Sequence, residues 1–247
     1  MHFSLAIDDD LAEKLCEFKE NQKCDIGIIE KILHYYKGYP SFTRNYFKRY
    51  YIDINIQRNI LQSYSHIDWD SLESIRKNTI YKIILSSQRN VKLPYVSIYD
   101  DKIENNFTAT FFKNEPRQNA LEYFRLLLEN ANCIFIYDIY LFQNNVWSAF
   151  IDFAMHCFPN RPFNIFYPQS VASRQNVKLF CKQIKQNNSY WNLKPDKNHQ
   201  NFINLHDRYL VIDNRVEVIL TSGIEYLMNT NKDFTYIIRL HRQSLAL

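Results

Sequence analysis

The feature that most constrains the fold is a pair of short apolar runs near the end of the chain. The first, residues 209–212, is mostly aliphatic and β-branched and ends at the turn-forming pair Asp213-Asn214. The second, Val216–Leu220, has the same character and follows directly. Short apolar runs separated by such a turn are typical of a buried β-hairpin. The sequence therefore predicts that two antiparallel core strands lie close to the C-terminus.

Upstream of this hairpin, helical and strand-like patterns alternate. Strands are expected at Cys133–Tyr137, 163–167 and Phe234–Leu240, and helices at 117–130, 146–158 and 171–185, with 186–205 as a connection. Alternation of this kind is typical of an α/β domain. The predicted fold class is therefore α/β, a mixed sheet with helices on both faces.

Two further regions precede this domain. Residues 1–78 are expected to be helical, because apolar residues recur at helical spacing behind the capping run Asp8-Asp9-Asp10. The first expected helix carries Leu11 and Leu15. Three more are expected at 25–37, 42–51 and 53–64, and a short helix is expected after Trp69. Strands at 80–86, 91–99 and 106–112 make residues 79–115 a strand-rich connecting region. The predicted organisation is thus 1–78, 79–115 and 116–247.

The composition disfavours several classes of protein. With three glycines the chain contains no glycine-rich phosphate loop, which disfavours a nucleotide-binding ATPase or dehydrogenase. Five cysteines, an odd number without a CxxC pair, are expected to be reduced thiols. No signal peptide and no membrane span is recognisable, so a cytoplasmic protein without a membrane partner is expected.

Positive charge is concentrated in the second half of the chain. Residues 116–247 hold 14 basic and 10 acidic residues, which accounts for the whole net charge of +4. Between Arg161 and Lys197 seven basic residues accompany one acid, Asp196. Such a surplus indicates an anionic partner, with a solubilising surface as the alternative.

His206, Arg208 and Asp213 precede and follow the first hairpin strand with the spacing H-x-R-x-x-x-x-D. This spacing resembles the H-x-K-x-x-x-x-D motif of the phospholipase D superfamily, with arginine in place of lysine. The stretch His-Asp-Arg-Tyr that begins at residue 206 is also similar to the phospholipase D-like C-terminal domain of MIT-domain proteins and its bacterial relatives. The resemblance covers residues 116–247.

The resemblance implies a metal-independent phosphodiesterase without a cofactor. His206 would be the nucleophile or the acid, Arg208 would hold the phosphate, and Asp213 would orient an imidazole. A chain with one such motif is expected to form a homodimer that supplies the second histidine. Bacterial relatives are often effectors of defence or toxin systems, so the resemblance implies a nuclease that acts as such an effector, for example in antiviral defence.

Other residues are expected to bind the substrate. Asp138 follows a predicted strand, where α/β proteins often bind ligands, although it could instead cap the next helix. Thr221 and Ser222 carry hydroxyl groups that could donate to a phosphate. Lys178 and Lys182 lie on one helix face and Tyr190 could stack on a base, which predicts binding of DNA or RNA. Lysines that only face water are the alternative.

Two further hypotheses remain open. In the first, the same domain binds a phosphate, a nucleic acid or a protein partner without turnover. In the second, the N-terminal helices bind a protein partner and the C-terminal domain serves as a dimerisation scaffold.

Overall fold

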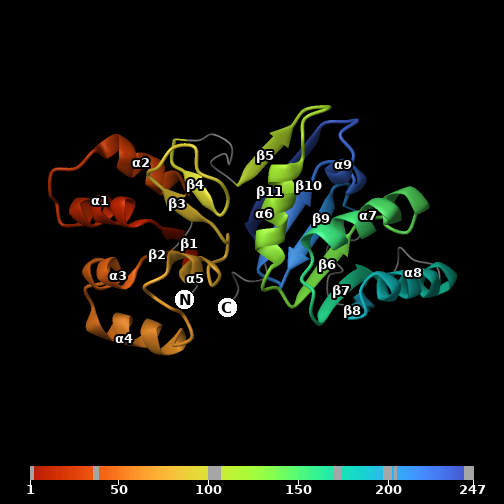
Figure 1. The fold of residues 1–247 in the computed structure, drawn as a ribbon, viewed down its shortest axis with the longest axis horizontal. Coiled ribbons are helices and arrows are strands. Elements are labelled where there is room, and N and C mark those ends of the chain that lie inside the picture. The colour runs from red at the N-terminus through yellow and green to blue at the C-terminus, as the bar shows by residue number, and fades with distance from the viewer. Residues whose placement is uncertain are drawn as a thin grey trace. The chain divides into compact units, whose positions relative to one another are not determined.

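The computed structural model describes residues 3–35, 39–99, 107–169, 174–196, 202 and 205–241 (Figure 1). The chain forms two compact units, Met1–Asn105 and Asn106–Leu247. This division differs from the predicted boundaries at 78 and 115. Part of the expected connecting region completes the sheet of the first unit, and the rest begins the second unit.

The first unit is built on a parallel sheet with the strand order β2-β1-β3-β4. Its strands are β1 (Phe3–Ile7), β2 (Tyr39–Ser41), β3 (Ile84–Ser86) and β4 (Tyr95–Ser97). The prediction that residues 1–78 are purely helical is wrong at β1 and β2. Every residue of β1 is buried, so this short strand lacks the alternation of apolar and polar residues that identifies a half-exposed strand.

The predicted helices of the first unit are confirmed with small shifts at their ends. They are α1 (Asp9–Lys19), α2 (Ile26–Tyr35), α3 (Arg44–Tyr50), α4 (Ile54–Ser63) and α5 (Leu72–Arg76). The Asp8 carboxylate accepts a hydrogen bond from the Leu11 backbone N–H at the start of α1 and another from the Ser87 N–H just after β3. One capping residue thus joins the first helix to the sheet.

The second unit contains a mixed sheet with the order β5-β11-β10-β9-β6-β7-β8. Its strands are β5 (Thr108–Phe111), β6 (Cys133–Tyr137), β7 (Phe163–Pro168), β8 (Trp191–Asp196), β9 (Arg208–Ile212), β10 (Val216–Leu220) and β11 (Phe234–Leu240). The predicted hairpin is β9 and β10, which pair antiparallel. Asp213 and Asn214 have φ values of 48° and 55°, as in a type I′ turn. The stretch 186–205, predicted as a connection, contains β8.

The described helices of the second unit pack on one face of this sheet. They are α6 (Gln118–Leu128), α7 (Asn144–Cys157), α8 (Arg174–Asn187) and α9 (Glu225–Met228). Phe124 of α6 lies 5.3 Å from Tyr236 of β11, and Phe180 of α8 stacks at 5.3 Å on Phe142, which contacts Tyr167 of β7.

The prediction of helices on both faces is wrong for the described residues of the second unit. The steps β5 to β6, β6 to β7 and β7 to β8 run in one direction across the sheet, and right-handed crossovers then leave successive helices on the same side. The opposite face is packed by Phe202, whose ring lies 5.6 Å from Phe135 and 4.8 Å from Tyr209. Within the described ranges, none of the helices has the length and apolar character needed to cross a membrane.

If β1 is the centre of the first unit's core, Leu5→Ala will lower the free energy of opening of that unit by about 2–5 kcal/mol, because Leu5 is 1% exposed. Ile52→Ala is the matched control, because Ile52 is 71% exposed, and a change within about 0.5 kcal/mol is expected. Hydrogen exchange of β1 and β3 in the full chain measures both. Equal effects of the two substitutions would place residues 3–7 outside the core.

Candidate functional site

The ends of the adjacent strands β10, β9 and β6 lie side by side at one edge of the second unit's sheet. Tyr137, the last residue of β6, pairs with Tyr209 of β9, and Arg208, the first residue of β9, pairs with Leu220, the last of β10. Asp138 therefore lies beside Arg208, and the residue after Leu220 follows on the other side. We call this the carboxyl edge, because the parallel strands β6, β7 and β8 all end there.

Arg208 is held at the carboxyl edge by a buried carboxylate and an aromatic ring. Its Nε lies 4.0 Å from Oδ2 of Asp138, and its guanidinium lies 5.6 Å from the centre of the Tyr140 ring. The Arg208 side chain is 17% exposed. A partly exposed guanidinium held in one orientation is suited to pair with an oxyanion.

Asp138 is the most deeply buried acid of the edge, with 2% of its surface exposed. Its Oδ1 accepts a hydrogen bond of 2.8 Å from the Tyr140 backbone N–H, whereas Oδ2 has no hydrogen-bond partner among the described residues. Burial raises the pKa of Asp138, and the Glu225 carboxylate raises it further. The Tyr140 and Ile224 N–H groups and Arg208 oppose that rise in its pKa.

His206 lies at the same edge but in solvent. Its side chain is 94% exposed, and Nδ1 lies 3.7 Å from Oδ1 of Asp207. His206 precedes β9 in a bend, so the alternation of a strand does not place its ring beside the Arg208 guanidinium. The structure brings the two residues to one edge, with the imidazole accessible and the guanidinium partly buried.

Asp213 does not belong to this site. It lies in the turn after β9, at the opposite edge of the sheet from Arg208, about 16 Å away along an extended strand. Its Oδ1 accepts hydrogen bonds of 2.9 Å from the backbone N–H groups of Asn132 and Cys133. The prediction that Asp213 orients an imidazole is therefore corrected to a structural role.

Thr221 and Ser222 lie at the carboxyl edge, as predicted, but their hydroxyl groups are engaged. Thr221 Oγ1 donates to the Thr235 carbonyl at 3.3 Å, and Ser222 Oγ donates to the Asp233 carbonyl at 3.2 Å. A phosphate would have to compete with these two carbonyl groups for the hydroxyl protons. Thr221 is exposed, so its hydroxyl can turn towards a ligand.

The basic helix and its aromatic neighbour are only partly placed near the edge. Lys178 and Lys182 are exposed on α8, which begins near the carboxyl edge and runs away from it. Tyr190 is 52% exposed but directly precedes β8, so it lies at the opposite edge. The side chain of Arg174 and all of His199 lie outside the described residues.

Sequence reasoning missed Glu225, the first residue of α9. Its Oε2 is buried without a hydrogen-bond partner among the described residues. The adjacent signal was Gly223, where a Cβ atom would overlap that oxygen. Glycine here provides space for the carboxylate rather than an unusual backbone conformation.

The described part of the second unit places no second histidine at the carboxyl edge. His156 is exposed on α7, and His241 is buried beyond β11, where its Nδ1 lies 3.0 Å from Oε2 of Glu217. The His241 backbone N–H donates to the Arg215 carbonyl, next to the β9–β10 turn, so His241 lies at the edge opposite Arg208.

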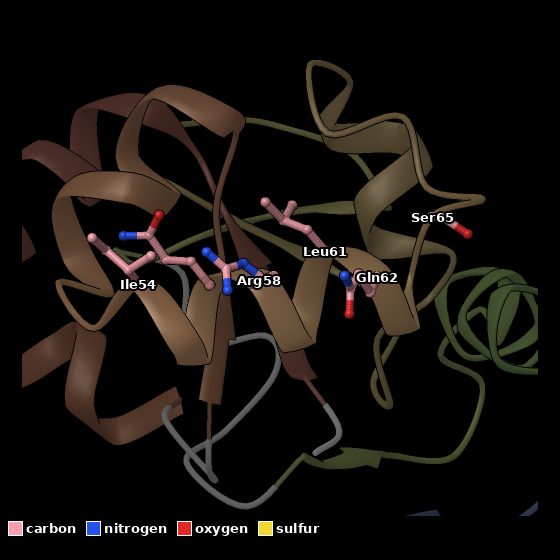
Figure 2. Close-up of a pocket in the computed structure, with 6 residues that line it drawn as sticks. Ile54, Arg58, Leu61, Gln62 and Ser65 are labelled. Carbon is pink, nitrogen blue, oxygen red and sulfur yellow. The ribbon is translucent and has the colours of Figure 1, made fainter.

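Other kinds of site find less support in the structure. Among the described residues, no group of three or more His, Cys, Asp or Glu side chains is arranged to hold a metal ion. A shallow pocket lies along α4 in the first unit (Figure 2), lined by Ile54, Gln57, Arg58, Leu61, Gln62 and Ser65. Arg58 is the one ionisable residue of this lining, so the pocket lacks an acid–base pair.

Similarity to known proteins is weak. No protein-family model matches the chain, and a search of curated proteins finds no significant match. Among solved structures, the chain is similar to TrmBL2, an archaeal chromatin protein described as showing a novel mode of DNA binding, at 12% identity and a TM-score of 0.24. The match covers 56% of this chain and 48% of that chain, so it spans about half the length of TrmBL2. A TM-score of this size does not establish a shared fold.

Asp213→Ala will lower the free energy of unfolding of the second unit by about 1–3 kcal/mol, because two backbone N–H groups lose their acceptor. Asp213→Asn keeps an oxygen acceptor and tolerates the positive φ, so a smaller loss is expected. Denaturant unfolding measures both. If Asp213→Ala left the free energy of unfolding unchanged but abolished cleavage of nucleic acid, the predicted role of Asp213 in orienting an imidazole would be restored.

Asp138→Asn will change how stability depends on pH. Burial raises the pKa of Asp138, so its carboxyl contributes stability below its unfolded pKa of about 4, and that contribution is lost as pH rises through the folded pKa. The free energy of unfolding of the wild type, relative to Asp138→Asn, should therefore fall as pH rises from about 4 through the folded pKa. Asp152→Asn, which removes an exposed acid from α7, is the control. If the free energies of unfolding of the wild type and Asp138→Asn differed by the same amount at every pH, burial would not raise the pKa of Asp138.

Proposed function

We propose that the second unit is a phosphodiesterase domain that cleaves nucleic acid as a homodimer, with its active site at the carboxyl edge. The observation that carries this proposal is the solvent-accessible imidazole of His206 at the same edge as the Arg208 guanidinium. An accessible imidazole can attack phosphorus, and a guanidinium can neutralise the non-bridging oxygens. The motif H-x-R-x-x-x-x-D around β9 supports a phospholipase D-like fold for this unit.

The reaction has two balanced steps. A ring nitrogen of His206 attacks phosphorus and forms a P–N bond, while the bond to the leaving oxygen breaks and that oxygen takes a proton from His206 of the second copy. Water then attacks phosphorus, the P–N bond breaks, and the imidazole of the second copy takes the water proton. The products are a phosphate monoester and an alcohol.

The homodimer follows from the number of histidines that this chemistry needs. One imidazole forms the covalent intermediate, and another must protonate the leaving oxygen. Among the described histidines of the second unit, His206 is the one at the carboxyl edge, so a twofold axis near it would supply the second imidazole.

Nucleic acid is the proposed substrate because of the exposed positive charge along α8, the helix that begins near the carboxyl edge. Lys178 and Lys182 are exposed along α8 and can follow a phosphate backbone. This support is electrostatic and applies to DNA and RNA alike.

A second candidate is phosphate binding without turnover. The contact between Arg208 and the buried Asp138 favours it, because a guanidinium already paired with a carboxylate has less charge to offer a transition state. Both candidates place the phosphate at the same edge and differ only in whether His206 reacts.

Cleavage of labelled single-stranded DNA, double-stranded DNA and RNA by the full chain in EDTA tests the proposal. His206→Ala removes the proposed nucleophile and the proposed acid together, so cleavage should fall by at least about 100-fold to 10,000-fold, the usual contribution of an acid–base group alone. His156→Ala, which removes an exposed histidine from α7, is the matched control and should cleave at the wild-type rate.

Three results would count against parts of the proposal. Binding without cleavage would favour the second candidate, and cleavage by His206→Ala at the wild-type rate would contradict the mechanism. Sedimentation of the wild type as a monomer would contradict the homodimer.

A further inference from the structure

Tyr140 presents a partly exposed aromatic ring at the carboxyl edge. The residue is 43% exposed, and the centre of its ring lies 5.6 Å from the Arg208 guanidinium, the group proposed to hold the phosphate. Because the negative face of an aromatic π system attracts a guanidinium, this contact holds the two side chains together. The edge therefore combines a cation suited to a phosphate with an aromatic surface directly beside it.

The backbone of Tyr140 is fixed by hydrogen bonds on both sides. Its N–H donates to Oδ1 of the buried Asp138 at 2.8 Å, and its carbonyl accepts from the Gln143 N–H at 2.9 Å, just before α7 begins. A tyrosine side chain has only two χ angles, so a ring on a fixed backbone loses little conformational freedom when a ligand covers it. Tyr140 is thus positioned before a ligand binds.

We propose that Tyr140 stacks on an unpaired base beside the phosphate held by Arg208, so that the substrate is single-stranded nucleic acid. A nucleotide matches these two groups, because its sugar joins a phosphate to a base with a flat aromatic face. In a duplex the neighbouring base pairs cover both faces of a base, whereas an unpaired strand can turn a base onto an aromatic side chain at little cost. This inference rests on the proposed function and names its substrate class.

The alternative partner of Tyr140 is a second copy of the chain. Ile139, which precedes it, is also exposed, and two such side chains at the edge where the homodimer is proposed would suit a subunit interface. In that case Tyr140→Ala would weaken the dimer and would lower the affinity for single strands and duplexes alike. Sedimentation of the variant and the strandedness of the nucleic acid that it binds separate the two partners.

Fluorescence anisotropy with a 5′-fluorescein oligothymidine and with a fluorescein-labelled duplex tests the inference in the His206→Ala background of the full chain. Tyr140→Ala should bind the single strand about 5-fold to 150-fold more weakly, the effect of one lost stack, and should bind the duplex within about twofold of its parent. Tyr140→Phe keeps the ring and should bind as its parent does. Tyr190→Ala is the matched control, because Tyr190 is 52% exposed in the same unit but lies at the opposite edge, and its affinities should not change.

A strand without bases separates stacking from a change in the position of Arg208. A tetrahydrofuran abasic strand of the same length keeps every phosphate, and loss of the bases and loss of the ring should not add if the two interact. Tyr140→Ala should therefore bind the abasic strand as tightly as its parent does.

Four results would overturn the inference: an equal loss of affinity for the abasic strand, unchanged binding of the single strand by Tyr140→Ala, dissociation of the dimer in this variant, or no binding of any oligonucleotide. Single-strand binding that depends on Tyr140, without cleavage by the wild type, would leave the inference standing and remove only the proposed turnover. Cleavage that does not depend on Tyr140 would remove only the inference.

Discussion

The register of β9 depends on the hydrogen bonds that Asp213 makes to the start of β6. Its Oδ1 accepts from the N–H groups of Asn132 and Cys133, and its own N–H donates to the Cys133 carbonyl. A shift of one residue would move every β9 side chain to the other face of the sheet. Arg208 would then leave Asp138 and face the aromatic cluster on the opposite side. The turn at one edge therefore determines the chemistry at the other.

The side chains at the carboxyl edge differ in their conformational freedom. Asp138 is buried and fixed by the Tyr140 N–H, and Arg208 is confined between this carboxylate and the Tyr140 ring. His206 is exposed and unconstrained by the strand. A fixed cation at the same edge as an accessible imidazole suits a site that is completed by a ligand or by a second copy of the chain.

The sequence predicted the strands whose apolar content is unambiguous. β6, β10 and β11 have the predicted bounds, because apolar residues predominate in each run and a polar residue follows it. β8 was missed because Lys194 and Pro195 interrupt its apolar pattern. These residues are tolerated because β8 is the outermost strand of the sheet. The motif located Arg208, but its spacing alone could not show that Asp213 lies at the far end of the strand. Glu225 had no signal of its own, because its position depends on tertiary packing.

Binding of a phosphodiester at the carboxyl edge of the second unit is tested most directly by hydrogen exchange of the full chain with and without an oligonucleotide. We expect slower exchange at residues 136–140, 205–209 and 220–225, with no change at the turn 213–215 or along α4. Protection confined to α4 or to that turn, with none at the carboxyl edge, would contradict binding at this site.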